Sequence, residues 1–121
     1  MQPVKKLLIV DDELGILEEV RDYFLEEGFE VYTADTGKDG IDLVTSLKPD
    51  LMLLDMKLPD MSGIEVLKTC KDLSPGTRVV VATGYVDQKI IDQAERLGRD
   101  VFLQKPFNLE HLKAEIDRLL T

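Results

Sequence analysis

Residues that could bind a metal ion and transfer a phosphoryl group follow four short apolar runs of the sequence. Asp11 and Asp12 follow the first run, and Asp55 follows the second. Thr83 follows the third run, and Lys105 lies two residues after the fourth. Carboxylates ligate hard cations, an aspartate can attack phosphorus, and a hydroxyl and an ammonium can bind phosphoryl oxygens. These residue types together predict phosphoryl transfer to an aspartate.

The charges of this set favour a divalent cation. Asp11, Asp12 and Asp55 carry three negative charges when ionised, and the Lys105 ammonium offsets one of them. Clustered carboxylates are costly to keep ionised without a cation. Mg²⁺ would neutralise the set, and it prefers a few carboxylates together with water and phosphate oxygens. The sequence therefore predicts Mg²⁺ as the cofactor.

The apolar runs have the length of β-strands and do not alternate with polar residues, which is typical of strands buried on both faces of a parallel sheet. A fifth run, residues 29–34, mixes apolar and polar residues and suits an edge strand. Segments with helical apolar spacing separate the runs. The predicted strands are residues 7–10, 29–34, 51–54, 79–82 and 101–103, and the predicted helical segments are 14–24, 41–47, 64–70, 90–97 and 109–119.

Five repeats of strand and helix predict an α/β fold with a parallel sheet and helices on both faces. Ligands of such folds bind beyond the carboxyl ends of the strands, where the candidate residues lie. Ser62 and Glu65 form a sequence pattern for a capping box, and Asp87 and Asn108 are predicted N-caps. Asp60 lies in a turn-rich segment and is predicted to be a turn residue.

The composition limits the class of protein. The chain has 121 residues, of which 44% are hydrophobic, and no linker interrupts it, so we expect one domain over residues 1–121 without an effector domain. A net charge of −9 argues against direct binding of nucleic acid. One cysteine and one histidine argue against a disulfide and a zinc site. No apolar run is long enough to span a membrane. We expect a cytoplasmic domain that binds neither nucleic acid nor membrane.

Four segments in order resemble the receiver domain of two-component response regulators. The resemblance covers nearly the whole chain and implies a flavodoxin-like (βα)₅ fold with strand order 2-1-3-4-5. The segments are residues 8–13 (LIVDDE), 53–63 (LLDMKLPDMSG), 81–84 (VATG) and 102–107 (FLQKPF).

The resemblance also implies roles for individual residues. Asp55 matches the phospho-acceptor, Asp12 matches the residue that ligates Mg²⁺ directly, and Asp11 matches the residue that supports the metal largely through water. The backbone carbonyl of Lys57 matches a further metal ligand. Lys57 and Tyr85 occupy variable positions that tune dephosphorylation in the family.

Further implied roles belong to the third and fourth segments. Thr83 and Lys105 match the hydroxyl and the ammonium that bind the phosphoryl group. Thr83 and Phe102 match the two residues of the conformational switch, and the bond between Lys105 and Pro106 is expected to be cis. Arg99 departs from the family pattern, because a small residue is common at its position.

The resemblance implies a phosphorylation-activated regulator that is not an enzyme in its own right. A histidine kinase or a phosphotransfer protein would donate the phosphoryl group to Asp55 in the presence of Mg²⁺. The surface of the fourth helix, fifth strand and fifth helix would then bind a downstream protein, an effector domain outside this chain, or a second copy in a phosphorylation-dependent homodimer.

Three alternatives fit parts of the sequence. A phosphorylation-independent interaction module would have the same fold with an inactive site. A phosphatase that forms an aspartyl-phosphate needs Asp-x-Asp, whereas the sequence after Asp55 is Met56-Lys57. A flavin-binding electron carrier needs a loop rich in Ser, Thr and Gly after the first strand, where this chain has Asp11 and Asp12.

Overall fold

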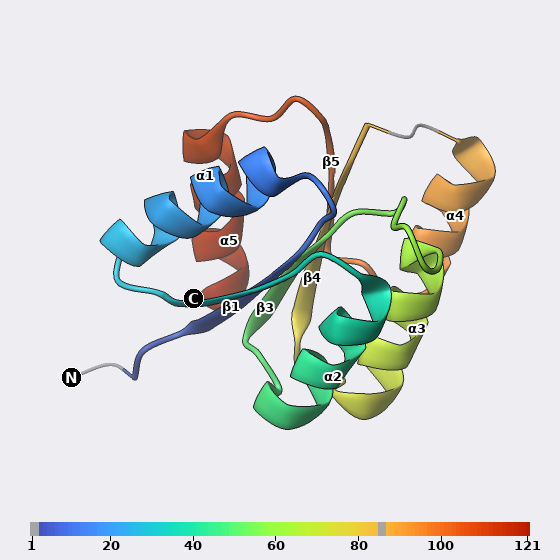
Figure 1. The fold of residues 1–121 in the computed structure, drawn as a ribbon, viewed down its shortest axis with the longest axis horizontal. Coiled ribbons are helices and arrows are strands. Elements are labelled where there is room, and N and C mark those ends of the chain that lie inside the picture. Colours follow the sequence, from blue (N-terminus) through green and yellow to red (C-terminus); the bar gives the residue numbers. More distant parts are fainter. Residues whose placement is uncertain (1–2, 85–86) are drawn as a thin grey trace.

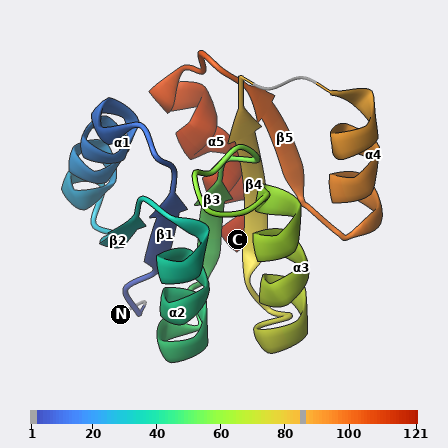
Figure 2. The same cartoon turned by 45° about the vertical axis from the view of Figure 1, so that its right-hand side comes forward.

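The computed structural model describes residues 3–84 and 87–121, so Tyr85 lies outside the described residues. Five parallel strands form one sheet in the order β2-β1-β3-β4-β5, which confirms the predicted fold (Figures 1 and 2). The strands are β1 (Lys6–Val10), β2 (Glu30–Ala34), β3 (Leu51–Leu54), β4 (Arg78–Thr83) and β5 (Val101–Gln104).

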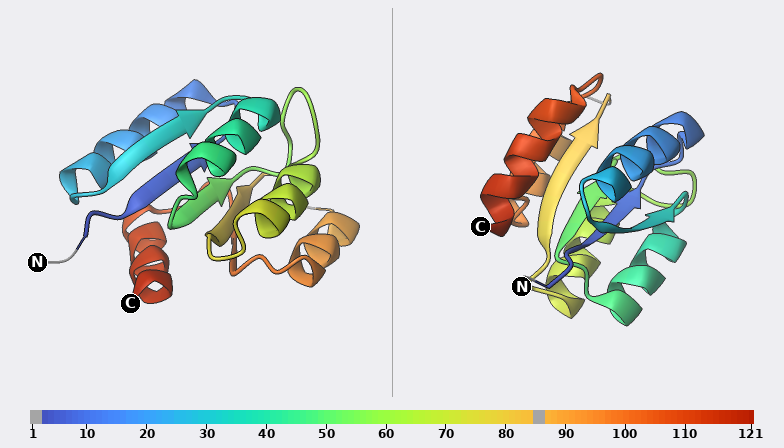
Figure 3. Two further views of the ribbon diagram at one scale, coloured as in Figure 1. Left: turned by 90° about the horizontal axis from the view of Figure 1, so that it is seen from below. Right: turned by 90° about the vertical axis from the view of Figure 1, so that its left-hand side faces the viewer.

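Helices cover both faces of the sheet. One face carries α1 (Leu14–Glu26) and α5 (Leu109–Leu120), and the other carries α2 (Gly37–Leu47), α3 (Gly63–Leu73) and α4 (Gln88–Arg96) (Figure 3). Each predicted helical segment lies within or next to one of these helices. The arrangement follows from parallel strands that are joined by helical crossovers.

Two hydrophobic cores flank the sheet, because alternate residues of each strand point to opposite faces. Leu8 and Val10 of β1 belong to the core beneath α2, α3 and α4. Leu7 and Ile9 of the same strand belong to the core beneath α1 and α5. All four residues have no exposed surface, which explains why this strand reads as a continuous apolar run. The outer strand β2 is only partly buried, as predicted for an edge strand.

Strand register brings the candidate site residues to one edge. Val10 pairs with Leu54, and Leu54 pairs with Val81. Thr83 at the end of β4 pairs with Gln104 at the end of β5. The residues that follow these pairs therefore share the carboxyl edge of the sheet.

The predicted N-caps of α4 and α5 are correct, whereas the capping box predicted for α3 differs in its donor. The Asp87 side chain accepts a hydrogen bond from the Lys89 amide at 2.8 Å, and the Asn108 side chain accepts one from the His111 amide at 3.0 Å. The capping box predicted at Ser62 is not formed as expected, because Ser62 Oγ accepts from the Ile64 amide at 3.1 Å. The Glu65 amide, its expected donor, bonds the Ser62 carbonyl at 3.0 Å.

Candidate functional site

The Lys105 ammonium lies at the centre of the site. Its Nζ is 2.6 Å from Asp11 Oδ2, 2.9 Å from Glu13 Oε1 and 3.0 Å from Asp55 Oδ2. These contacts join the ends of β1, β3 and β5, and they span up to 94 residues of sequence. The structure thus brings together carboxylates and an ammonium that the sequence placed after separate strands.

Backbone amides orient two of the carboxylates. Asp11 Oδ1 accepts a hydrogen bond from the Glu13 amide at 2.9 Å, and Asp55 Oδ1 accepts one from the Lys57 amide at 3.2 Å. In each case the donor lies two residues after the aspartate, in the loop that follows the strand. The other oxygen of each carboxylate is thereby directed toward Lys105 Nζ.

Three aspartates form a group with the chemistry of a hard-cation site. Asp11, Asp12 and Asp55 each offer a carboxylate oxygen, and these oxygens all lie within 4.8 Å of one another. Asp11 and Asp55 are buried, whereas Asp12 is exposed and accessible to an ion from solution. Oxygen ligands of this type and number fit Mg²⁺, which keeps several waters when it binds one or two carboxylates.

The site carries an excess of negative charge. Three carboxylates contact the Lys105 ammonium, and Asp12 adds a fourth carboxylate to the group, so the set has a formal charge of −3 when all of these groups are ionised. Burial raises the pKa of the Asp11 carboxyl despite its hydrogen bond to Lys105. Burial alone would lower the pKa of Lys105, but its hydrogen bonds to Asp11, Glu13 and Asp55 outweigh that effect and raise it. Three carboxylates stabilise the charged form of Lys105, whereas Asp11 shares this one ammonium with Glu13 and Asp55. An additional cation would therefore stabilise the ionised carboxylates of the site.

A cleft of about 400 Å³ opens beside these carboxylates. Thr83 lines it as a buried residue at the end of β4, and exposed Lys57 lines it from the loop after β3. Phe102 does not line this cleft in the described part of the chain, and it packs instead against the core beneath α2, α3 and α4. Among the described residues, its lining consists of Asp12, Glu13, Asp55, Lys57, Leu58, Pro59, Thr83 and Gly84.

The peptide bond between Lys105 and Pro106 is cis. It lies in the loop between β5 and α5, directly after the residue whose ammonium joins the three carboxylates.

Two residues of the site region were given no functional role from the sequence. Glu13 contacts Lys105, and its position directly after Asp11 and Asp12 is the signal that was available. Asp60 lies in the predicted turn, but its carboxylate also accepts hydrogen bonds from the Gly37 amide at 2.8 Å and the Lys38 amide at 2.9 Å. No local pattern predicts that contact, because its partners lie more than 20 residues away.

Comparison with known proteins places this geometry in a family. The model of the response regulator receiver domain matches residues 7–117. Sporulation initiation phosphotransferase F of Bacillus subtilis is 37% identical over 96% of this chain and 94% of its own length. The cell cycle transcriptional regulator CtrA of Caulobacter vibrioides is 35% identical, and the chain spans about half of it, at 48% of its length. The regulatory protein AtoC of Escherichia coli is 32% identical, and the chain spans 26% of its length.

Solved structures agree with these relatives. A CheY-like receiver domain protein from Methanospirillum hungatei has a TM-score of 0.96 and 34% identity, with 98% of this chain and 94% of that chain covered. A response regulator from Burkholderia pseudomallei, solved with a phosphorylated aspartic acid, a calcium ion and citrate, has a TM-score of 0.86 and 28% identity over 92% of this chain and 65% of that chain. Among the described residues, no helix is both long enough and apolar enough to cross a bilayer.

Proposed function

The chain belongs to the response regulator receiver domain family of two-component signalling, and on that premise we propose that it is a switch activated by phosphorylation of Asp55. The observation that carries the proposal is the position of Asp55 beside both the Lys105 ammonium and the carboxylates of Asp11 and Asp12. An aspartate in that position can attack a phosphoryl group while neighbouring charges balance the transfer. We further propose that residues 1–121 act as one receiver domain.

The metal of this site is proposed to be Mg²⁺. Asp12 and Asp55 would hold it through carboxylate oxygens, Asp11 would support it largely through water, and the Lys57 carbonyl would add a ligand. When bound, Mg²⁺ supplies positive charge that offsets the charge of the phosphoryl oxygens. The acidic cluster supports this assignment, because its excess of negative charge suits a divalent cation.

The proposed step transfers a phosphoryl group to an Asp55 carboxylate oxygen. A new bond forms between that oxygen and phosphorus, while the bond from phosphorus to the donor breaks and its electron pair leaves with the donor. The proposed donor is a histidine kinase or a phosphotransfer protein, and the proposed location is the cytoplasm. Lys105 and the Thr83 hydroxyl bind the phosphoryl oxygens, which places a cation and a donor where negative charge accumulates.

Phosphorylation is proposed to change the surface formed by α4, β5 and α5. The aspartyl phosphate carries about −1.5 to −2 charges, as other phosphorylated residues do, in place of the single negative charge of the Asp55 carboxylate. Thr83 follows the phosphoryl group, and Phe102 turns into the space that Thr83 leaves. To move an equilibrium from 1:99 to 99:1, the modified site must favour the active state by about 5.5 kcal/mol. The altered surface would bind a downstream protein, an effector domain or a second copy of the chain.

Intact mass spectrometry with acetyl phosphate tests the proposal. We expect one phosphoryl adduct on the wild type in the presence of Mg²⁺ and none on Asp55→Asn. Asp72→Asn is the matched control, because Asp72 is an exposed aspartate on α3 and the charge change is the same. A wild type that gains no adduct under any condition would instead support an interaction module that works without phosphorylation.

A further inference from the structure

The loop between β3 and α3 is held at both of its ends. At its base, the Gly63 amide donates to the Met56 carbonyl at 2.8 Å, and Lys57 and Ser62 form an antiparallel bridge. The same base carries the Asp55 carboxylate, which accepts from the Lys57 amide. The loop is therefore a small closed hairpin whose base belongs to the phosphorylation site.

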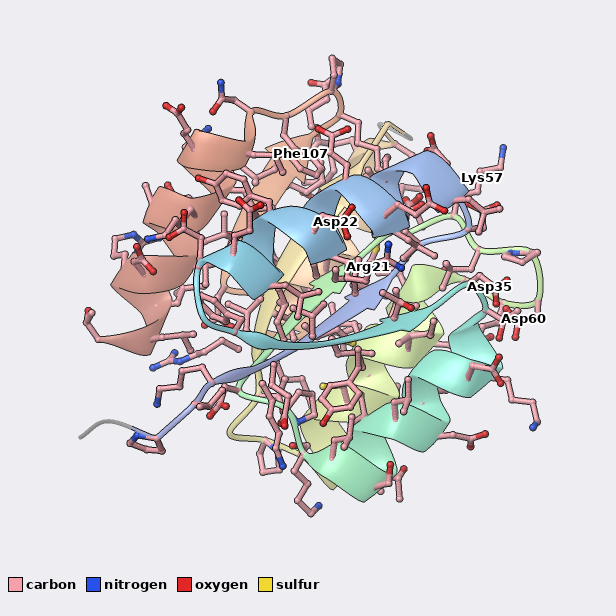
Figure 4. All side chains as sticks on the ribbon, turned by 60° about the vertical axis from the view of Figure 1, so that its left-hand side comes forward. Arg21, Asp22, Asp35, Lys57, Asp60 and Phe107 are labelled. Atoms are coloured by element: carbon pink, nitrogen blue, oxygen red, sulfur yellow. The ribbon has the colours of Figure 1, made fainter. Side chains whose placement is uncertain are left out.

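The tip of this hairpin is fixed to α2. Both Asp60 carboxylate oxygens accept hydrogen bonds from the first helical amides, Oδ1 from Gly37 at 2.8 Å and Oδ2 from Lys38 at 2.9 Å. Figure 4 shows Asp60 beside the start of α2, with Lys57 earlier in the same loop. A negative charge at this end of a helix also interacts favourably with the helix dipole.

Apolar packing supports the same contact. A side-chain carbon added at Gly37 would collide with the Met61 side chain, so the backbone of α2 and the loop tip are close-packed. The hydrogen bonds from Gly37 and Lys38 lower the pKa of Asp60, which remains a carboxylate at neutral pH. Asp60 is thus the polar link between α2 and the hairpin, and Met61 is the apolar one.

We propose that Asp60 is a positioning residue for the phosphorylation site. Asp60 fixes the tip of the β3–α3 hairpin to the N-terminus of α2, and it thereby holds the Lys57 backbone in place for metal binding. The proposal rests on the proposed function, because it concerns the same metal and the same acceptor. Asp60 lies at the tip and neither the metal nor the phosphoryl group needs to touch it. The effect of Asp60 reaches Lys57 through the hairpin. Because the antiparallel bridge joins Lys57 to Ser62, a movement of the tip also moves the base.

The test measures phosphorylation by acetyl phosphate as a function of Mg²⁺ concentration for Asp60→Ala and Asp60→Asn. Residues that orient metal ligands typically change metal affinity by 10–100-fold, and Asp60 acts one step further away, so we expect Asp60→Ala to raise the half-saturating Mg²⁺ concentration about 3–10-fold. The rate constant at saturating Mg²⁺ should stay within about twofold, since Asp55, Thr83 and Lys105 are unchanged. Asp60→Asn keeps one acceptor oxygen and should show a smaller rise, and Asp72→Ala on α3 should show none.

Amide hydrogen exchange without metal or phosphoryl donor provides an independent measurement. We expect faster exchange of the Lys57 and Gly63 amides in Asp60→Ala, because both amides donate within the hairpin that Asp60 fixes. Unchanged exchange at both amides, or a half-saturating Mg²⁺ concentration equal to that of the wild type, would overturn the proposal. If the wild type accepts no phosphoryl group, the proposed function fails, and amide exchange together with Mg²⁺-dependent melting still decides the role of Asp60. Asp60→Asn serves for both measurements if Asp60→Ala does not fold.

Discussion

At the scale of the residue, Lys105 and the carboxylates around it have unequal numbers of charged partners. Lys105 has three carboxylate neighbours, whereas Asp11 is buried and shares that single ammonium with Asp55 and Glu13. Burial raises the pKa of Asp11, so ionised Asp11 is a cost to the metal-free fold. Burial at this position therefore favours a neutral group over a carboxylate.

Asp11→Asn should stabilise the metal-free protein. The amide oxygen can still accept from the Glu13 amide, and Lys105 keeps Asp55 and Glu13 as partners. Loss of one buried charge should raise the free energy of unfolding by about 1 kcal/mol, a moderate single-substitution effect, and Tm by about 4 °C. Thermal melting in EDTA measures the change, with Asp72→Asn as control. A lower Tm than that of the wild type would show that the ion pair with Lys105 outweighs the burial of Asp11.

The same substitution should alter the pH dependence of stability. The pKa of Asp11 is raised above its usual value of 3.8, so the folded protein binds this proton more tightly than the unfolded chain. Its contribution to stability therefore increases as pH falls through the raised pKa toward 3.8. Asp11→Asn removes that contribution, and we expect its stability to fall more steeply than that of the wild type over this interval. Urea unfolding at a series of acidic pH values measures the difference, and parallel curves would contradict it.

Arg99 is a second residue with a polar group in an unfavourable environment. Its Nε atom is buried and has no hydrogen-bond partner among the described residues. An unsatisfied buried donor costs about 1–3 kcal/mol. Arg99→Met keeps an unbranched apolar stem and removes the donor, so we expect the free energy of unfolding to rise by about 1 kcal/mol. Denaturant unfolding measures it, and exposed Arg96→Met on α4 is the control, with a change within about 0.5 kcal/mol.

At the scale of the element, close packing of the β3–α3 hairpin against the end of β3 limits which residue can begin α3. A side-chain carbon at Gly63 would collide with the Asp55 carbonyl oxygen and lie 2.5 Å from Met56 Cα. Both of those atoms belong to the backbone and cannot rotate away. The start of α3 and the backbone of Asp55 and Met56 are thus one packed unit.

Gly63→Ala should destabilise the protein, whereas Gly15→Ala should stabilise it. The first change forces backbone apart and should cost about 3 kcal/mol, at the upper end of the usual range for overpacking. Gly15 lies in the first turn of α1 with nothing within 4 Å of its added carbon, so alanine there should gain about 0.5–1 kcal/mol. Urea unfolding of the two variants compares the same chemical change at a crowded and an open site. Equal effects would contradict the packing argument.

The elements themselves were predictable from the sequence, but their contacts with distant loops were not. Buried parallel strands read as apolar runs, and their carboxyl ends meet at one edge, so the meeting of Asp11, Asp55 and Lys105 follows from the topology. The contact of Asp60 with α2 depends on how a loop folds back across more than 20 residues. The spacing of residues in the sequence does not predict the path of this loop. The Ser62 side chain also accepts from the Ile64 amide and not from the predicted Glu65 amide. The Ser62 backbone forms a bridge with Lys57, and the capping-box sequence pattern does not predict that contact.

At the scale of the whole molecule, the chain carries an excess of negative charge, and part of that charge is clustered at one edge of the sheet. The chain has a net charge of −9, and three aspartates bring their carboxylate oxygens within 4.8 Å of one another at one edge of the sheet. General repulsion is screened by any salt, since the Debye length is about 10 Å at 0.1 M. The repulsion within the cluster acts over much shorter distances. Monovalent salt and Mg²⁺ should therefore stabilise the fold to different degrees.

Mg²⁺ should raise Tm well beyond the effect of NaCl at equal ionic strength. A ligand that binds only the folded state stabilises it by about 2.7 kcal/mol at one hundred times its Kd, which for a domain of this size is about 10 °C in Tm. Asp12→Asn should lose most of that rise, because Asp12 is the exposed carboxylate of the cluster and the one open to an ion from solution. Asp72→Asn removes the same charge from an exposed position on α3 and should keep the full rise. If both variants responded to Mg²⁺ as the wild type does, the stabilisation would come from the overall charge of −9 and not from a bound ion at the end of the sheet.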